Sequence, residues 1–230
     1  MATVILVRHG RTSANASGVL AGRQLGVVLD EVGVAQAIRT ADRLAGVSLS
    51  ALVSSPLERT MQTAETILER QKRHRHTFTI ARDERLAECD YGTWQGRSLK
   101  ELSKESLWKQ VQGHPSSVTF PQGESMVAMQ TRAVEAIREW NVTLGEKAVY
   151  AVVSHGDVIK AILADALGMH LDQFQRIAID PCSLSVVSYT KMRPFVLRTN
   201  DSGSDVSFLT SKSRKKKSSD AAVGGGAGHG

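Results

Sequence analysis

Short apolar runs alternate along the chain with longer segments in which apolar residues recur every three or four positions. The short runs predict buried strands, because a central strand that is covered on both faces is apolar throughout. The longer segments predict amphipathic helices. This alternation is typical of an α/β protein. Strands are expected over residues 3–7, 51–54, 149–153 and 184–189, and helices around residues 34–45, 57–68, 126–140 and 158–167.

Several of these helices carry residues typical of helix ends. Ser55 predicts an N-terminal cap, with Pro56 as the first helical residue and Glu58 placed to reach back to the cap. Ser98 and Glu101 repeat the capping pattern and predict a shorter helix in the middle of the chain. A glycine that ends an apolar helical face, at position 168, predicts the C-terminal end of that helix.

The composition changes near residue 200. The chain has 230 residues, of which 41% are hydrophobic, and this is enough to bury the core of one domain. Residues 201–230 are poor in apolar side chains and rich in Ser, Lys and Gly, so they cannot bury enough surface to offset their ordering entropy. We therefore expect one domain over residues 1–200 and a disordered basic tail over residues 201–230.

The charge is only mildly positive. The net charge is +6, of which residues 1–200 contribute +4. Such an excess suits small anionic molecules and is too weak to indicate nucleic acid. The basic stretch at residues 69–76 has no interleaved aromatic residues, and we interpret it as a solvated helix end. The basic cluster at residues 214–217 is interpreted as part of a solvated tail, so we expect no specific nucleic-acid partner.

Cysteine usage and hydropathy indicate a cytoplasmic protein. Cys89 and Cys182 are far apart and form no CxxC pattern, which fits a reducing compartment and supports neither a disulfide framework nor a zinc site. No apolar run approaches the roughly 20 residues that a membrane span needs. The first residues also lack the basic region and cleavage site of a signal peptide. We expect a protein without a membrane partner.

Two predicted strands run directly into a histidine and a glycine. Arg8, His9 and Gly10 follow the first strand, and His155 follows the strand at residues 149–153. Because the carboxyl ends of neighbouring parallel strands meet in one crevice, the two histidines are expected to face each other there. Arg59 lies in the first turn after a third strand, so its side chain can point into the same crevice.

These residue types predict a site for an anion. Arg8 and Arg59 offer forked donors that suit phosphate or carboxylate, and nearby cations keep an imidazole such as that of His9 neutral and nucleophilic. Departure of an alkoxide needs a proton, and Glu88 in a glycine-punctuated loop is the best candidate to supply it. We expect Arg8 and His9 to be exposed at the strand end, with a bound phosphate compensating the positive charge.

Four blocks of sequence resemble one family. They are RHGRTSAN at residues 8–15, SSPLERT at residues 54–60, Glu88 followed by GTWQG at residues 92–96, and SHGD at residues 154–157. Together, and in this order, they are similar to the histidine phosphatase superfamily, also called phosphoglycerate mutase-like, over about residues 1–200. The resemblance implies a three-layer α/β/α fold with a mostly parallel central sheet.

The resemblance also implies a phosphohistidine mechanism that needs no metal and no cofactor, with a small phosphorylated metabolite as substrate. The acid would protonate the leaving group and then activate the water that cleaves the phosphohistidine. By this similarity the nucleophile is His9, the acid is Glu88, the phosphate pocket is formed by Arg8, Arg59 and His155, and Asn15 adds a hydrogen bond.

The blocks favour a phosphatase over a mutase. Phosphoglycerate mutases of this family resemble one another in a His-Tyr pair directly after the acid, whereas Cys89 and Asp90 stand there in this chain. The Gly-x-Trp-x-Gly loop at residues 92–96 resembles instead the broad-specificity phosphatase and ribazole-phosphate phosphatase branch. A phosphoglycerate-type phosphomutase and a non-catalytic phosphate-binding module stay open as alternatives. The oligomeric state stays open between a monomer and a homodimer.

Overall fold

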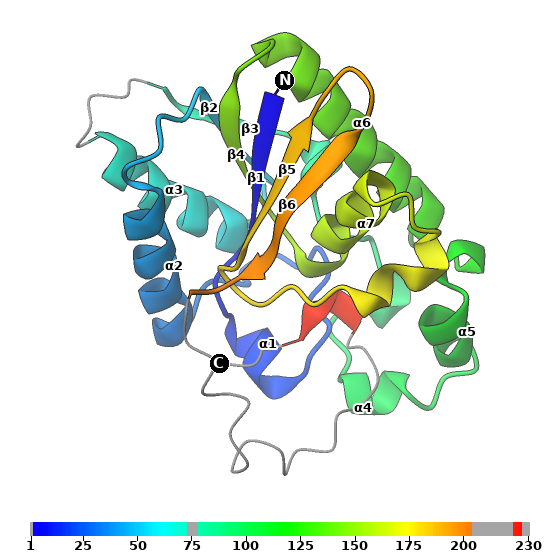
Figure 1. Ribbon diagram of the computed structural model, residues 1–230. Coiled ribbons are helices and arrows are strands. Elements are labelled where there is room, and N and C mark those ends of the chain that lie inside the picture. Colours follow the sequence, from blue (N-terminus) through cyan, green and yellow to red (C-terminus); the bar gives the residue numbers. More distant parts are fainter. Residues whose placement is uncertain (1, 73–77, 204–222, 227–230) are drawn as a thin grey trace, which may run out of the picture.

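Six strands form one mixed sheet in the order β3-β2-β4-β1-β5-β6 (Figure 1). The computed structural model describes residues 2–72, 78–203 and 223–226. The strands β1 to β4 run parallel to one another, whereas β5 is antiparallel to both of its neighbours, β1 and β6. The strands are β1 (Ala2–Arg8), β2 (Ala51–Ser54), β3 (Ile80–Arg82), β4 (Val149–Ser154), β5 (Leu184–Tyr189) and β6 (Pro194–Asp201).

Helices cover both faces of the sheet, which confirms the three-layer α/β/α prediction (Figure 1). Side chains alternate along β1, so that Val4 and Leu6 enter one apolar cluster while Ile5 and Val7 enter the other. Helices α2 and α3 pack in the second cluster, and α6 and α7 in the first. The helices are α1 (Ser13–Ser17), α2 (Glu31–Leu44), α3 (Glu58–Lys72), α4 (Leu99–Leu102), α5 (Trp108–Gly113), α6 (Met126–Leu144) and α7 (Gly156–Ala166).

Short 3₁₀ helices occupy several of the connections between these elements. In the part of the chain that the structure describes they cover Glu84–Leu86, Gly92–Trp94, Pro115–Ser117, Leu171–Arg176 and Val223–Gly225. The first two flank Glu88, so the candidate acid lies in a connection that turns tightly on either side of it.

Two strands were not predicted from the sequence. β3 has only three residues, and an apolar pattern cannot be recognised over so short a run. In β6 the large apolar residues Phe195 and Leu197 are exposed, so this edge strand lacks the apolar run that marks a buried one. Both lie at an edge of the sheet, where one side of the strand pairs with no other strand among the described residues.

The predicted helix ends were right in two cases and wrong in one. Ser98 and Glu101 form the expected capping box of α4, and Gly168 takes a left-handed conformation just after α7, with φ +66°. The start of α3 was predicted wrongly, because the helix begins at Glu58 rather than Pro56. The side chains have other partners, since Ser55 Oγ bonds to His155 and the Glu58 carboxylate accepts a hydrogen bond from the Gly26 N–H.

The structure describes the chain beyond residue 200 only in part. β6 continues to Asp201, and residues 223–226 lie at the carboxyl end of the parallel strands. The basic cluster predicted at residues 214–217, most of the predicted tail and part of the basic stretch at residues 69–76 lie outside the described residues. Among the residues that are described, no helix combines the length and the apolarity that a membrane crossing requires.

Candidate active site

The end of β1 brings His9 into the site with a defined tautomer. Its Nδ1 lies 2.7 Å from the carbonyl oxygen of Gly10. Because a carbonyl can only accept, Nδ1 carries the proton of the neutral ring and Nε2 keeps its lone pair. Arg59 Nε donates to Nε2 over 3.3 Å, which agrees with this assignment. Burial, then Arg59 and Arg8, hold the pKa of His9 well below its usual range, so the ring is a neutral nucleophile.

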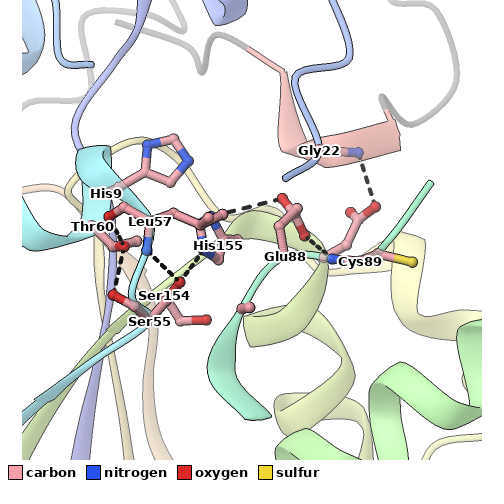
Figure 2. Close-up of polar contacts among 12 residues, drawn as sticks. His9, Gly22, Ser55, Leu57, Thr60, Glu88, Cys89, Ser154 and His155 are labelled. Atoms are coloured by element: carbon pink, nitrogen blue, oxygen red, sulfur yellow. Dashed lines mark hydrogen bonds and ion pairs between the residues drawn. The ribbon is translucent and has the colours of Figure 1, made fainter. Parts of the chain in front are cut away.

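The second histidine lies at the end of β4 and faces the first (Figure 2). The ring centroids of His9 and His155 are 5.3 Å apart, as expected for side chains at neighbouring strand ends. His155 Nε2 and Ser55 Oγ share a hydrogen bond of 2.7 Å, which fixes the orientation of the ring. Burial, followed by Arg59 and His9, lowers the pKa of His155 well below its usual value.

Glu88 lies beside His155 and has the properties of a proton donor (Figure 2). One carboxylate oxygen accepts a hydrogen bond of 3.0 Å from the Cys89 N–H. The other lies 4.0 Å from His155 Nδ1. Burial, assisted by the negative charge of Asp157 and opposed by Arg59, raises the pKa of Glu88 to about 7. The group therefore holds a proton near neutral pH, where an ordinary glutamate is ionised.

Arg59 extends from the first turn of α3 into the site. Its Nη2 donates to the carbonyl oxygen of Gly22 over 2.7 Å. Its Nη1 is buried and has no hydrogen-bond partner among the described residues. A buried cationic donor without an acceptor is costly unless a ligand supplies one, so Nη1 marks a place for an anionic oxygen next to His9.

Arg8 and His9 are more buried than predicted. Arg8 is fully buried and His9 is 2% exposed, which corrects the expectation of an exposed pair at the strand end. Carbonyl groups compensate the charge, since Arg8 Nη1 donates to Ile179 over 2.8 Å and Nη2 to Gly226 over 2.5 Å. Burial lowers the pKa of Arg8 from its usual value, although Glu88 partly offsets this.

Asn15 lies at the other side of the site, in α1. Its amide oxygen accepts hydrogen bonds from the Thr12 N–H and Oγ, at 3.1 and 2.9 Å. This capping box uses the acceptor atom of Asn15, so only the NH₂ group is left for a ligand. A donor at this point suits a phosphoryl oxygen.

A small cavity joins these groups. Its volume is about 20 Å³, and its lining includes four of the predicted site residues, His9, Asn15, Arg59 and Glu88. Arg8 and His155 are not part of the lining, although His155 contacts Glu88 and Arg8 precedes His9. The other lining residues are Thr12, Gly18, Val19, Leu20, Ala21, Gly22, Leu99, Val223, Gly224 and Gly226.

Arg132 on α6 holds the connection that carries Glu88. Its Nη1 donates to the carbonyl oxygens of Arg85 and Ala87, at 2.6 and 2.8 Å, and its Nη2 donates to that of Glu88 at 3.1 Å. Glu124 pairs with Arg132 at 2.6 Å and accepts the Asp90 N–H at 2.8 Å. One guanidinium group thus fixes three backbone carbonyl groups of the connection, including that of the candidate acid itself.

The sequence analysis did not identify some of these contributors. Ser55 was interpreted as a helix cap, and its contact with His155 could not be read from a local pattern. Arg132 left a weak signal, because it is a charged residue adjoining the apolar face formed by Met129 and Ala133. Asp157 was not among the predicted site residues, yet it is fully buried and accepts a hydrogen bond of 2.8 Å from the Tyr91 hydroxyl.

Metal ligands were not predicted for this site. Within residues 2–72, 78–203 and 223–226, the structure contains no group of three or more His, Cys, Asp or Glu side chains arranged to hold a metal ion. The site as described presents two neutral imidazoles, one protonated acid and two guanidinium groups, a set that suits a phosphoryl group.

The fold and the paired histidines define an enzyme of the phosphatase or mutase class. The chain belongs to the histidine phosphatase superfamily, branch 1, whose family description matches residues 4–202. It is 33% identical over 215 residues to the probable phosphoglycerate mutase GpmB of Proteus mirabilis (strain HI4320), covering 91% of this chain and 96% of that protein. A probable phosphoglycerate mutase GpmB from Yersinia pestis (strain Pestoides F) is also 33% identical, over 192 residues covering 82% of this chain and 86% of that protein.

Solved structures of similar fold include Bacillus stearothermophilus YhfR. It is 27% identical, covers 87% of this chain and 98% of its own, and superimposes with a TM-score of 0.79. A phosphoserine phosphatase mutant from Entamoeba histolytica in complex with phosphoserine is 23% identical, covers 88% and 98% of the two chains, and has a TM-score of 0.78. The latter likeness concerns the fold alone.

Proposed function

We propose that this protein is a phosphatase that hydrolyses small phosphomonoesters through a phosphohistidine intermediate on His9. The observation that carries the proposal is the pairing of a neutral His9, whose Nε2 lone pair is kept free of a proton, with a protonated Glu88 in the same cavity. A nucleophile and an acid with these protonation states at one pH are what cleavage of an alkyl phosphate requires.

In the first step, His9 Nε2 attacks phosphorus and the bond between phosphorus and the leaving oxygen breaks. Glu88 gives its proton to that oxygen, so the alcohol leaves neutral. Arg8, Arg59, His155 and the NH₂ group of Asn15 bind the phosphoryl oxygens, where negative charge accumulates in the transition state. The unpartnered Nη1 of Arg59 is well suited to this role.

In the second step, the Glu88 carboxylate accepts a proton from water. The water oxygen attacks phosphorus, the bond between Nε2 and phosphorus breaks, and inorganic phosphate leaves. Nε2 recovers its lone pair and Glu88 is again protonated, so the cycle is complete. No metal or cofactor enters either step of the proposed mechanism.

A phosphoenzyme trap tests this proposal. The enzyme is incubated with a ³²P-labelled phosphomonoester and quenched rapidly, and the label is expected on protein as a base-stable, acid-labile adduct. His9→Ala should carry no label and have no turnover, whereas His114→Ala, which changes an exposed histidine, should behave as the parent does. Turnover of the phosphomonoester by the His9→Ala variant would contradict the mechanism.

A phosphoglycerate-type mutase is the second candidate, because curated relatives 33% identical to this chain are named probable phosphoglycerate mutases. The lining of the cavity favours the phosphatase. Phosphoglycerate carries a carboxylate, yet beyond Arg59 the described residues that line the cavity offer no further cationic side chain to bind it. Other side chains of the lining, such as Val19, Leu20 and Leu99, are apolar.

An assay and a substrate screen separate a phosphatase, a mutase and a non-catalytic phosphate-binding module. With 3-phosphoglycerate as substrate, a phosphatase releases inorganic phosphate and a mutase yields the 2-phospho isomer. A parallel screen of sugar phosphates, nucleotides, phosphoserine and alkyl phosphates identifies the organic part of the substrate. Tight binding of one of these ligands without any turnover would instead establish a non-catalytic phosphate-binding module.

A further inference from the structure

Residues near the C-terminus occupy the mouth of the active site. The 3₁₀ turn Val223–Gly225, red in Figure 1, contacts α7 at the carboxyl end of the parallel strands. Val223, Gly224 and Gly226 line the cavity together with His9, Arg59 and Glu88. The family match ends at residue 202, so this segment, residues 223–226, belongs to a part of the chain that the family description does not cover.

The segment makes specific contacts with the site. The Gly226 carbonyl oxygen accepts a hydrogen bond from Arg8 Nη2 at 2.5 Å, and the Gly224 N–H donates to Asp157 Oδ2 at 2.9 Å. Val223 is 2% exposed and joins the apolar cluster that contains Leu20. One end of the segment is therefore held by a phosphate-pocket arginine, and the other by a buried carboxylate and an apolar contact.

The sequence of the segment suits this position. Gly224 has φ +73°, a conformation that favours glycine. A Cβ atom built on it would lie 2.8 Å from Leu20 Cδ1. A larger residue would thus be strained in its backbone and would press against the wall of the cavity.

The remaining space is too small for a substrate. A cavity of about 20 Å³ holds roughly one water molecule, whereas a phosphomonoester brings a phosphoryl group and an organic part. The Gly226 carbonyl also occupies one donor, Nη2, of Arg8, a residue that the proposed mechanism assigns to the phosphoryl oxygens. Substrate and segment cannot occupy the site together.

We propose that the mouth of the active site is a binding site for the chain's own residues 223–226, which compete with the phosphate of the substrate. The ligand is a glycine-rich peptide. The site binds its Gly226 carbonyl through Arg8, its Gly224 N–H through Asp157 and its Val223 side chain in the apolar cluster. The peptide inhibits by raising the apparent KM and leaves kcat unchanged, because the open enzyme carries the complete catalytic set. The role of Arg8 in this competition rests on the proposed function.

Point variants of the full-length chain test the competition. Val223→Asp places a carboxylate in an apolar contact, and Gly224→Ala introduces the clash with Leu20, so both should release the segment. If the segment covers the site about nine-tenths of the time, release lowers the apparent KM for p-nitrophenyl phosphate about tenfold. Gly46→Ala is the matched control, because its Cβ would meet nothing within 4 Å.

Binding of inorganic phosphate gives a readout that does not depend on turnover. Calorimetry should show a dissociation constant for phosphate that falls about tenfold in both release variants and is unchanged in the control. A synthetic peptide of residues 218–230 should inhibit the Val223→Asp enzyme competitively, and the same peptide with Gly224→Ala should not. Unfolding midpoints of all variants show whether a change in binding reflects folding.

The outcomes distinguish this inference from the proposed function. If the release variants bind phosphate more tightly but no ester is hydrolysed, the proposed function fails and the competition stands. If phosphate binding is equal in the parent and both release variants, or weaker in the variants, the competition is wrong whatever the enzyme hydrolyses. A fall in kcat in both release variants, with KM unchanged, would show that the segment assists catalysis and would overturn the inhibitory role.

Discussion

Single side chains in this site take their protonation states from burial. His9 and His155 lose their charged forms because water is excluded and Arg59 is near, while Glu88 retains its proton for the same reason of burial. One desolvated environment thus produces both a neutral base and a neutral acid. In water the two residue types would titrate in the opposite order, with the carboxyl group ionising well below the imidazole.

The pH dependence of the reaction should follow Glu88. Its pKa is raised to about 7, and the acid works only when protonated, so kcat/KM for an alkyl phosphate should fall about tenfold per pH unit above pH 7. Glu88→Gln should remove this limb and lower the rate by about 10²–10⁴. The measurement is a pH–rate profile for both enzymes. Activity that rises as the pH increases through 7 would contradict the assignment of Glu88 as the acid.

At the scale of elements, α6 positions Glu88, the candidate acid, which lies outside this helix. Arg132 Nη1 and Nη2 donate to three carbonyl groups of the connection that carries Glu88, so the helix fixes the acid relative to the sheet. Arg132 does not line the cavity and acts through Glu88. Its influence should therefore depend on how much the leaving group needs a proton.

Arg132→Gln should lower kcat/KM for an alkyl phosphate by about tenfold or more, because kcat/KM reports the step in which the leaving group takes its proton. With p-nitrophenyl phosphate, whose leaving group needs little protonation, kcat/KM should be nearly unchanged. Steady-state kinetics with the two substrates provide the comparison. Arg138→Gln on the same helix is the control, because Arg138 is exposed and pairs with Asp165. Equal losses with both substrates would indicate a general structural effect instead.

The contact between α2 and the loop after His9 depends on two glycines. A Cβ on Gly33 would lie 2.0 Å from the Arg11 carbonyl oxygen, and one on Gly10 would lie 2.5 Å from the Gly33 carbonyl oxygen. The helix therefore approaches the catalytic loop by backbone contact. Neither glycine has a positive φ, so the requirement comes from space and not from backbone conformation.

Gly33→Ala should destabilise the protein by about 1–3 kcal/mol, because α2 must shift away from the loop to accommodate the methyl group. Helix propensity alone predicts a gain of about 1 kcal/mol for the same change. Denaturant unfolding measures the sign. The Gly46→Ala variant, which meets no close atom, should stay within about 0.5 kcal/mol of the parent. A stabilised Gly33→Ala variant would refute the close-packing argument.

On the scale of the whole molecule, the antiparallel strands β5 and β6 close one edge of the sheet. Asn200 near the end of β6 donates to the Asp180 carboxylate and accepts the Asp180 N–H, at 3.0 and 2.6 Å. Asp201 forms an ion pair of 2.7 Å with Arg43 on α2. The folded unit therefore includes β6 to its last residue, one position beyond the predicted boundary at residue 200.

A chain that ends at Gly203 keeps every strand that the structure describes and loses the contacts of residues 223–226, so its free energy of unfolding should fall by only about 1.4 kcal/mol if that segment is bound about nine-tenths of the time. A chain that ends at Thr190 lacks β6 and loses the five residue pairs that join β5 and β6. At roughly 0.5 kcal/mol for each pair, this loss amounts to about 2.5 kcal/mol. Unfolding curves of the three chains give the comparison, and equal midpoints for the two shortened chains would contradict it.

The sequence by itself determined the class of fold, the four buried strands and the six candidate site residues. The class of fold and the strands depend on local patterns, namely apolar runs and helical periodicity, so they can be read along the chain. The full set of candidate site residues depends in addition on the four sequence blocks that resemble the histidine phosphatase superfamily. The two edge strands escaped prediction, because one has three residues and the other exposes its large apolar side chains.

Only the tertiary structure decided how the site is completed. The protonation states of His9 and Glu88 depend on burial and on charges that are distant in sequence. The hydrogen bond between Ser55 and His155 and the carbonyl contacts of Arg132 also join residues that are distant in sequence. The same holds for residues 223–226, whose apolar content is too small to indicate a packed position but whose backbone finds partners in Arg8 and Asp157. Burial and hydrogen bonding between distant segments exist only once the chain has folded, and for this reason no local sequence pattern predicts them.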